Sequence, residues 1–458
     1  MFLGFDSLHD LTRAVERRRV SPTELVDASL AAIAREQPRL NAFITVMTEP
    51  ARAAARALEQ RLARGAGQGL LAGVPLAVKD LLLTRDAPTT AGSRIYADGL
   101  TGSDAVVVAR MRRAGAIVVG KTSLHEIALG VTNVNEHFGP ARNPWNTAHV
   151  SGGSSGGSAV AVAADLCPAA IGTDTRGSIR IPASCCGITG FKPTYGLVPV
   201  EGVLPLAPSL DHVGPMARSV DDVALLLAAM LGQTRQSERL RKAPRAGTKR
   251  LTVGVSEYHL RDLDGSVARA IESALRDLRP LVRELRDVHI AELDGVQEAS
   301  AVLAGVQAVA LHDAHLRTNP GGFGPLVRKR LEGGYQRTAV EYLRALEMQA
   351  KVRAAFAATF QSVDLLVGAT MPAPPARIDE HHMCLNGMEV NTVDTSTRCN
   401  APQNVAGLPS LSVPCGLAAG LPTGLQIVGP MRGDATVLAL GGAWQRATDW
   451  HRRVAGRS

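Results

Sequence analysis

The sequence predicts an α/β protein, because strand-like and helix-like segments alternate along much of the chain. Between residues 70 and 121 an apolar, strand-like run is followed by a loop, a helical stretch at 104–114 and a short buried strand at 116–122. Such alternation implies a sheet with substantial parallel character. The 458 residues would suffice for two or three average domains or for one large α/β unit.

Residues 5–65 are expected to be helical and to lie against the sheet. Ser21 and Glu24 have the spacing of a capping box, and Pro22 occupies the first helical position, where its missing N–H costs nothing. Apolar residues then recur at helical spacing through residues 26–34. This segment is interpreted as a scaffold for the rest of the chain.

The segments that follow continue the alternation. Strand-like stretches extend to about residue 215, and a helix is expected at 220–231. The polar, basic stretch 233–250 is interpreted as a solvated loop between two lobes of one sheet. The segments expected after it are a strand at 251–256, mainly helices at 266–360, strands within 363–375, 408–416 and 424–430, and a final helix at 435–448.

The net charge of +8 and the isoelectric point near 9.4 are interpreted as a solvated basic surface. Arginines are scattered along helical segments instead of forming one block, which disfavours a nucleic-acid site. Aromatic residues make up only 3% of the chain, so stacking platforms for single strands are scarce. No nucleic-acid partner is expected.

Targeting and metal signals are weak. The first ten residues lack a basic region and include Asp6, unlike a signal peptide, and no run of about 18 uncharged apolar residues predicts a membrane span. The six cysteines show no C-x-x-C zinc spacing, and His381 and His382 near Cys384 are interpreted as a loop. The thiols are expected to be free and buried in a reducing cytoplasm.

Two glycine- and serine-rich loops within residues 152–187 are the main sequence signal for function. Ser154 and Ser178 lie in these loops, beside five glycines whose bare main chain suggests close approach to another group. Exposed backbone N–H groups suit an anion, either a phosphate or the transient oxyanion of acyl transfer. A phosphate loop would place a lysine after the glycines, and none follows. Acyl transfer is therefore favoured, provided that a base lies elsewhere.

Lys79 is the candidate base. It lies in an apolar, strand-like run, where alternation would place Val78 and Asp80 on one face and Lys79 on the other, beside Ala77 and Leu81. Asp80 is then poorly placed to keep the lysine charged, and desolvation would lower its pKa. A buried neutral lysine can act as a general base.

A Ser-His-Asp hydrolase is the competing interpretation. The string Gly153-Ser154-Ser155-Gly156 lacks the G-x-S-x-G spacing of a nucleophile elbow. His212 lies in no recognisable partner motif, and no H-E-x-x-H metal motif is present. Both the histidine triad and a metal hydrolase are therefore disfavoured.

The sequence resembles the amidase signature family in its three central segments. These are GVPLAVKD around Lys79, GGSSGGS around Ser154 and GTDTRGSIRIPA around Ser178. Further matching segments are FKPTYGLVP at 191–199, SLDHVGPMARSVDD at 209–222 and NVAGLPSLSVPCG at 404–416. The resemblance covers most of the chain.

The resemblance implies one domain over residues 1–458, with a mixed, mostly parallel sheet and helices on both faces. Its expected segments are a helical scaffold (1–65), a catalytic core segment (66–225), a helix-rich segment (251–360) and C-terminal core strands with a helix (361–458).

The resemblance also assigns roles to individual residues. Ser178 is the expected nucleophile, and Ser154, after a cis peptide bond, bridges it to Lys79. Backbone N–H groups from Thr175 through Arg176 and Gly177 to Ser178 are expected to hold the oxyanion and to contact substrate. Lys121, a second lysine after an apolar strand, is interpreted as structural. Neither a metal nor an organic cofactor is expected.

The resemblance leaves the substrate open between two classes. Free-standing family members hydrolyse small amides, and some act on carbamates, ureas or esters. The rival is the glutaminase (A) subunit of a tRNA-dependent amidotransferase, which usually carries a tyrosine in an M-Y-L-x-D-I-like segment. The equivalent stretch here, residues 393–409, has no tyrosine. We therefore expect a free-standing amidase, as a monomer or homodimer; a family-like protein without catalysis is disfavoured because all three catalytic positions are present.

Arg176 departs from the family pattern, which has a small residue, usually glycine, two positions before the nucleophile. A side chain there would make a positive φ cost about 1–3 kcal/mol. In one interpretation the guanidinium pairs with Asp174 or another acid. In the other, Arg176 lies at the pocket wall and biases substrate choice by bulk or charge.

Overall fold

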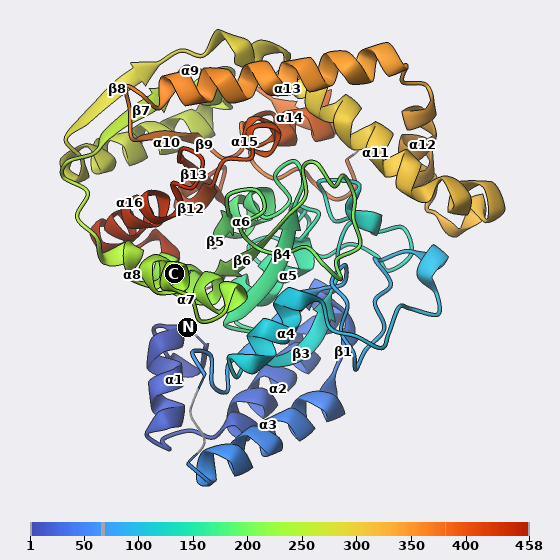
Figure 1. Ribbon diagram of the computed structural model, residues 1–458, viewed down its shortest axis with the longest axis vertical. Helices are drawn as coiled ribbons and strands as arrows, with labels where there is room; N and C mark the ends of the chain where they lie inside the picture. Colours follow the sequence, from blue (N-terminus) through green and yellow to red (C-terminus); the bar gives the residue numbers. More distant parts are fainter. Residues whose placement is uncertain (1, 66–68, 381, 457–458) are drawn as a thin grey trace.

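A mixed 11-stranded sheet runs through the residues that the computed structural model describes, 2–65, 69–380 and 382–456 (Figure 1). In spatial order its strands are β1 (Phe43–Val46), β3 (Ile117–Thr122), β2 (Pro75–Lys79), β4 (Ala169–Asp174), β6 (His212–Ala217), β5 (Thr189–Lys192), β12 (Ser410–Ala418), β13 (Leu421–Val428), β9 (Leu365–Ala369), β7 (Thr252–Ser256) and β8 (Glu284–Val288). A separate hairpin pairs β10 (His382–Leu385) with β11 (Met388–Asn391).

Parallel pairing occurs in two blocks, β3–β2–β4 and β9–β7–β8, and antiparallel pairs join the strands between them. The β12–β13 hairpin turns at Ala419 and Gly420, both with positive φ, as a two-residue type I′ connection requires. In the first block Val78 is opposite Ile171. This register brings the carboxyl ends of β2 and β4 to the same edge of the sheet, where loops build a site.

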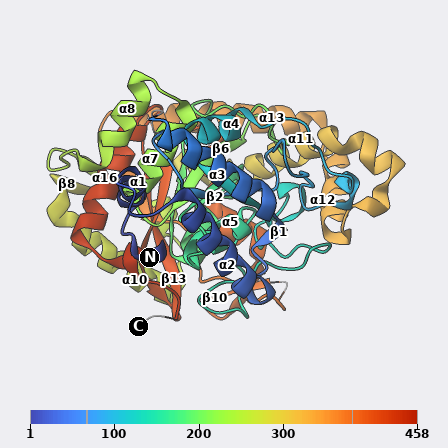
Figure 2. The same ribbon diagram turned by 90° about the horizontal axis from the view of Figure 1, so that it is seen from below.

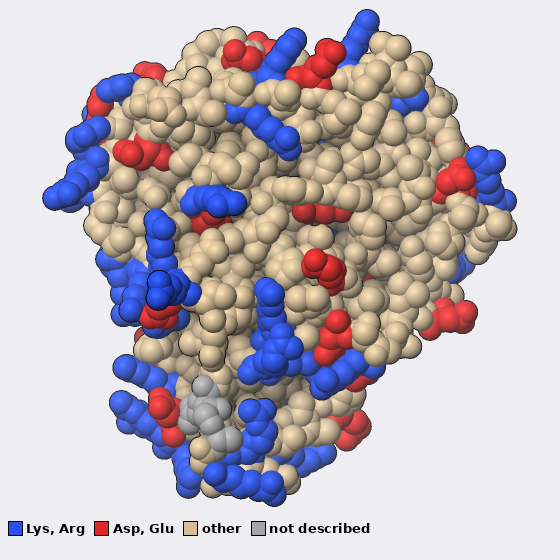
Figure 3. Space-filling model, viewed as in Figure 1, with Lys and Arg blue, Asp and Glu red and all other residues tan. Residues whose placement is uncertain are grey.

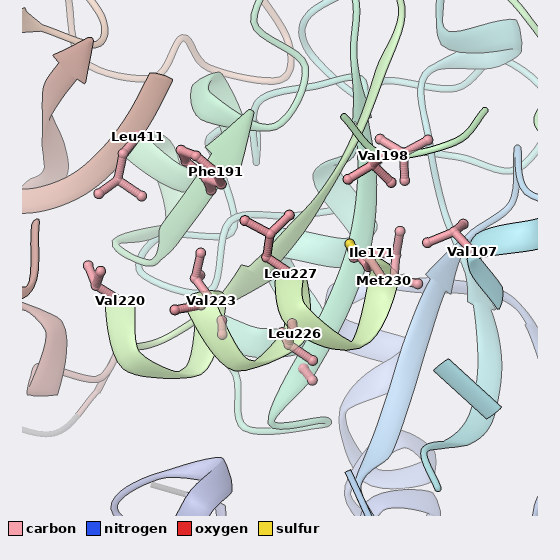
Figure 4. Packing of buried hydrophobic residues seen from close by; sticks show 14 of the residues in the cluster. Val107, Ile171, Phe191, Val198, Val220, Val223, Leu226, Leu227, Met230 and Leu411 are labelled. Carbon is pink, nitrogen blue, oxygen red and sulfur yellow. The ribbon is translucent and has the colours of Figure 1, made fainter. Parts of the chain in front are cut away.

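Helices cover both faces of the sheet, and each face has its own hydrophobic cluster. One face is covered by α2 (Pro22–Leu40), α3 (Thr48–Ala63), α5 (Gly156–Ala163) and α6 (Arg180–Cys186). The opposite cluster includes α1 (Leu8–Glu16), α4 (Val106–Arg113), α7 (Val220–Leu231), α10 (Gly265–Leu278) and α16 (Asp434–Ala447). Figure 2 shows α2 and α3 side by side, and Figure 4 shows Val223 and Leu227 of α7 projecting toward the strands. The predicted α/β class, with a mixed sheet between helices, is confirmed.

A further group of helices extends beyond the sheet at the upper right of Figure 1. These helices are α11 (Val296–Thr318), α12 (Pro325–Tyr335) and α13 (Ala339–Thr359). Two short helices, α14 (Thr392–Arg398) and α15 (Ala401–Ala406), connect this group to the strands of the C-terminal part. A third hydrophobic cluster joins α11, α13 and α15 to β9, so the extension is packed against the sheet.

Several local predictions hold. The capping box at the start of α2 is present: Ser21 Oγ accepts from Glu24 N at 3.1 Å, and Glu24 Oε2 accepts from Ser21 N at 2.7 Å. The expected helix at 220–231 is α7 with the same bounds, and those at 104–114 and 435–448 are α4 and α16 with shifts of one or two residues at their ends.

Two local predictions were wrong. The segment expected to be helical contains β1, because Phe43–Val46 pairs with β3 at the sheet edge. The expected loop at 233–250 contains α8 (Arg235–Lys242), which Thr234 caps by accepting from Ser237 N at 3.0 Å. The segment expected to be rich in helices does contain several, beginning with α9 (Glu257–Leu260), and it also contains one further strand, β8, which pairs in parallel with β7.

Charged side chains of both signs are spread over the face of the molecule seen in Figure 3. Basic and acidic side chains are interspersed there, with Lys and Arg more frequent toward the lower part of the view, where α1 and α3 lie in Figure 1.

Cys384 is exposed, contrary to the expected burial of all six thiols, because it lies on the small β10–β11 hairpin; the other five are buried. His381 lies outside the described residues, and His382 begins β10. Within the described ranges, no helix has the length and apolarity that crossing a membrane demands.

Candidate active site

Lys79 ends β2 with a fully buried side chain. Its Nζ lies 2.8 Å from Ser154 Oγ and 2.7 Å from Thr173 Oγ1, so its two polar neighbours are neutral hydroxyls. Burial lowers the pKa of Lys79 to about 7, although Asp174 and Asp211 act in the opposite direction. At neutral pH a large share of this lysine is therefore the unprotonated amine, which can accept a proton.

The alternation predicted along β2 is confirmed up to Lys79. Leu76 and Val78 belong to one hydrophobic cluster and Ala77 to the other. Leu81, expected beside the lysine, belongs instead to the cluster of Val78, because the strand ends at Lys79 and alternation stops there.

Asp80 and Lys121 form a separate, fully buried ion pair, with Lys121 Nζ 2.8 Å from Asp80 Oδ1. Thr90 and Thr89 complete it: the Thr90 hydroxyl donates to Asp80 at 2.5 Å, and Lys121 donates to the Thr89 hydroxyl at 2.5 Å. As predicted, Asp80 does not hold Lys79 charged. Lys121 holds an acid in place, which agrees with its predicted structural role.

Ser154 follows a cis peptide bond from Gly153 and lies just before α5. The glycines of this loop are required by close approach to neighbouring main chain. A Cβ on Gly157 would lie 2.4 Å from Ala42 O, and one on Gly153 would lie 2.9 Å from Asn133 N. The loop is therefore closely packed where it places the Ser154 hydroxyl 2.8 Å from Lys79 Nζ.

Ser155 joins the two loops to β4. Its backbone N–H donates to Ser178 O at 3.1 Å. Its hydroxyl donates to Thr173 O at 3.0 Å and accepts from Thr173 N at 3.2 Å. The loop of Ser154, the end of β4 and the loop of Ser178 therefore form one hydrogen-bonded unit.

The Ser178 loop, between β4 and α6, is organised by Asp174. This buried carboxylate accepts from Gly177 N at 2.8 Å, Ile179 N at 3.1 Å and two nitrogens of Arg180 at 3.0 Å each. Burial alone would raise its pKa, but the Arg180 guanidinium and the hydrogen bonds hold the pKa of Asp174 well below its usual range. The loop turns at Gly177, whose φ is +115°. A Cβ added at this position would collide with the side chain of Asn400.

Arg180 is fully buried and extends this network to the C-terminal part of the chain. Besides Asp174, it donates to Gln426 Oε1 at 2.7 Å, Asn404 Oδ1 at 2.6 Å and Asn400 O at 3.0 Å. Segments more than 200 residues apart thus fix the same short loop.

A cavity of about 380 Å³ opens beside Ser178. Ser178 is 6% exposed and lies in its wall together with Thr175 and Arg176. Among the described residues, no hydrogen bond joins the Ser178 hydroxyl to that of Ser154. Catalytic hydrogen bonds are often long before substrate binds, and this hydroxyl faces the cavity in which a substrate would lie.

Arg176 donates from Nε to Ser300 Oγ at 3.0 Å and from Nη2 to Thr397 Oγ1 at 3.2 Å. The alternative that it pairs with Asp174 was wrong, because Arg180 already occupies that carboxylate. The alternative that it lies at the pocket wall agrees with the structure.

The structure brings the sequence candidates together, with one restriction. Thr175 and Arg176 line the cavity with Ser178, but Gly177 N donates to Asp174. Within the described part of the chain, His212 is hydrogen-bonded to neither Ser154 nor Ser178. It is buried, its Nδ1 is 2.7 Å from Leu210 O, and its Nε2 is 3.1 Å from Lys192 Nζ.

Four residues that organise the site were missed in the sequence: Ser155, Thr173, Asp174 and Arg180. Ser155 is adjacent to the predicted bridging residue Ser154, and Thr173 lies five residues before Ser178, the predicted nucleophile. The signal for Asp174 and Arg180 was the presence of two opposite charges flanking the Gly177-Ser178 pair within an apolar segment.

Comparison with known proteins agrees with this geometry. A profile of the Amidase family matches residues 24–438. The chain is 39% identical to the A subunit of a glutamyl-tRNA(Gln) amidotransferase from Roseiflexus sp. (strain RS-1), covering 98% of this chain and 97% of the relative. Among solved structures it is similar to an amidase (TM-score 0.89, 37% identity, covering 96% and 99% of the two chains). It is also similar to a bacterial aryl acylamidase of the amidase signature family (TM-score 0.89, 26% identity, covering 99% of each chain). This chain belongs to the amidase family of amide-hydrolysing enzymes.

Proposed function

We propose that the protein hydrolyses the C–N bond of a small to medium amide through an acyl-enzyme on Ser178. The observation that carries the proposal is the contact between Lys79 and Ser154. A buried lysine whose pKa is about 7 lies 2.8 Å from a serine hydroxyl, one hydrogen-bonded step from the loop of the nucleophile. This is the arrangement expected of a general base that acts through a bridging hydroxyl.

The reaction begins with two proton transfers. Neutral Lys79 takes the proton of Ser154, and Ser154 takes that of Ser178 as the Ser178 oxygen bonds to the substrate carbonyl carbon. The carbonyl electrons move to oxygen and form the oxyanion. Because Gly177 N donates to Asp174, the donors for this oxyanion are the N–H groups of Thr175, Arg176 and Ser178. Loss of one such donor typically costs about 2.7–4 kcal/mol of transition-state stabilisation.

The oxyanion then collapses and the C–N bond breaks. The proton held by Lys79 returns through Ser154 to the leaving nitrogen, so the amine departs neutral. Water attacks the remaining ester of Ser178, with the same relay removing one of its protons, and the acid is released. The serine, the bridge and the lysine return to their starting states.

A free-standing amidase is the first candidate, with small amides as the main substrates and carbamates or esters as further ones. The aryl acylamidase and the amidase among the structural neighbours support this, as does the absence of a tyrosine in the sequence at 393–409. The protein would then work as a monomer or homodimer without a partner protein.

The second candidate is a glutaminase subunit of a tRNA-dependent amidotransferase. Its support is the 39% identity over nearly the whole length to a relative with the name of that A subunit. In this case glutamine would be the substrate, and the released ammonia would serve a partner subunit.

The test uses the purified chain alone on a panel of anilides, aliphatic amides, carbamates, esters and glutamine. We expect turnover of one or more small amides, and labelling of Ser178 by a fluorophosphonate. The Ser178→Ala variant should lose both. Labelling that persists at another residue would refute the nucleophile assignment, and glutaminase activity that requires added partner proteins and tRNA would select the second candidate.

A further inference from the structure

The cavity beside Ser178 contains a guanidinium without an acidic partner. Among the described residues, Arg176 forms no ion pair, and its hydrogen bonds go to the neutral hydroxyls of Ser300 and Thr397. Arg176 is partly buried, and a cation withdrawn from water is normally paired, because transfer of an unpaired charge out of water is costly.

The other charges that line the cavity do not neutralise Arg176. Arg330, from α12, donates to Leu129 O at 2.8 Å and lies 3.2 Å from His125 Nε2, so it too contacts uncharged groups. Arg337 is paired at 2.9 Å with Glu298 and at 3.1 Å with Glu341. The one acid among the described lining residues, Asp394, is exposed to solvent and makes no ion pair with Arg176.

The surroundings of Arg176 favour the binding of an anion beside its guanidinium. Burial lowers its pKa to about 10, and the more distant Asp394 and Glu298 only partly oppose that effect. The group therefore remains protonated at neutral pH, while its environment favours any additional negative charge.

The geometry of the guanidinium favours a carboxylate. Of its five N–H groups, the contacts to Ser300 and Thr397 use one on Nε and one on Nη2. The N–H groups that remain are on Nη1 and Nη2, and this pair is the edge that binds a carboxylate with two parallel hydrogen bonds. Because Arg176 is two residues from Ser178 and shares its cavity, a short molecule can contact both.

We propose that Arg176, supported by Arg330, binds a carboxylate of the substrate, so that the enzyme prefers amides with an acid group a few bonds from the scissile carbonyl. The proposal rests on the proposed function, because Ser178 defines where the reacting carbonyl lies. It names the substrate class of that site: monoamides of short dicarboxylic acids and related acidic amides.

The first experiment measures protection of Ser178 and does not require turnover. The rate of fluorophosphonate labelling is followed with glutarate or with the uncharged glutaramide as competitor. Glutarate should protect the wild type at lower concentration than glutaramide does. Arg176→Gln should weaken protection by glutarate about 10- to 100-fold, as expected for lost charge-assisted hydrogen bonds, and Arg176→Lys should be intermediate because it keeps the charge but loses the paired donors.

Arg328→Gln is the matched control, since Arg328 lies on the same helix as Arg330 but pairs with Glu332 at 2.7 Å outside the cavity. It should keep the wild-type protection constants. Equal protection by glutarate and glutaramide in the wild type would overturn the inference, as would an Arg176→Gln variant that glutarate protects as well as the wild type.

The second experiment compares turnover within isosteric pairs, succinamate with succinamide and glutaramate with glutaramide. The ratio of kcat/KM for acid over diamide should exceed one in the wild type and fall about 10- to 100-fold in Arg176→Gln. If Ser178→Ala is inactive and unlabelled but the wild type prefers the diamides, this inference fails and the proposed function stands. If Ser178→Ala retains labelling and turnover, the proposed function itself fails.

Discussion

Lys79 should set the pH at which the enzyme becomes active, because only its neutral form can accept the proton of Ser154. With a pKa of about 7, about half of the lysine is neutral at pH 7, against about one part in 2,500 for a lysine with an ordinary value near 10.4. Burial therefore increases the active fraction by about a thousand-fold at that pH. In the proposed mechanism, this is the contribution that the apolar surroundings of Lys79 make to the reaction.

The expected profile follows from the same pKa. The value of kcat/KM should rise with pH through about 7 and level off above 8. Between pH 8 and pH 6 it should fall about ten-fold, because the neutral fraction falls from about nine-tenths to about one-tenth. The measurement is kcat/KM for a neutral amide, whose own charge does not change in this range.

The Asp211→Asn variant tests the direction in which the midpoint of the pH profile should move. Asp211 raises the pKa of Lys79, so removal of its charge should move the midpoint to lower pH. Asp211 accepts hydrogen bonds from the N–H groups of Leu206 and Ala207 at 2.9 and 3.0 Å, and the side-chain oxygen of asparagine can accept them too. The asparagine NH2 group can donate to the Thr175 hydroxyl, which contacts Asp211 in the wild type. A wild-type rate that is flat from pH 5.5 to 8.5, or a midpoint near 10, would refute the argument; so would a midpoint that moves upward in Asp211→Asn.

Two further predictions concern stability. The pKa of Lys79 is depressed in the folded state, so between pH 7 and about 10 the unfolded chain binds a proton that the native chain releases, and native stability must rise with pH. Relative to Lys79→Met, the free energy of unfolding of the wild type should increase by about 1.4 kcal/mol from pH 6 to pH 8; urea unfolding that shows a constant difference would contradict the lowered pKa. Arg180→Met should cost about 3–5 kcal/mol, because it leaves the charge of Asp174 buried and unpaired. The double variant Arg180→Met/Asp174→Asn should recover part of that loss, and a double variant less stable than the single one would show that the charge is not the cause.

The sequence predicted those parts of the fold that depend on neighbouring residues. The capping box before α2, the apolar strand β3 and the helix α7 each carry a local pattern that tertiary contacts do not override. The strands β1 and β8 were missed because edge strands pair on one side only and need not be strongly apolar; β8 is mostly polar and exposed. The orientation of Lys79 followed from alternation, which failed at Leu81 where the strand ends.

The candidate site was predictable where chemistry lies within a short segment, and not where it depends on distant ones. Lys79, Ser154 and Ser178 were identified from their own motifs, and the structure places the first two in direct contact. The partners of Arg176 were not accessible to sequence reasoning, because Ser300 and Thr397 are 124 and 221 residues away. Their identity decides whether the guanidinium is neutralised or available, so the sequence left two interpretations open.

Three cations of this site, the buried Arg180 and Lys79 and the partly buried Arg176, show how the partner decides the role. Arg180 has a carboxylate and several amide oxygens as partners, so its hydrogen bonds fix the loop of Ser178. Lys79 has only two hydroxyls, and because an amine can release its proton, burial favours its neutral form, as the proposed base role requires. Arg176 also has only hydroxyls, but a guanidinium does not release its proton at neutral pH, so the same kind of environment yields a persistent charge facing the cavity. A carboxylate of the substrate would satisfy it in the way that Asp174 satisfies Arg180.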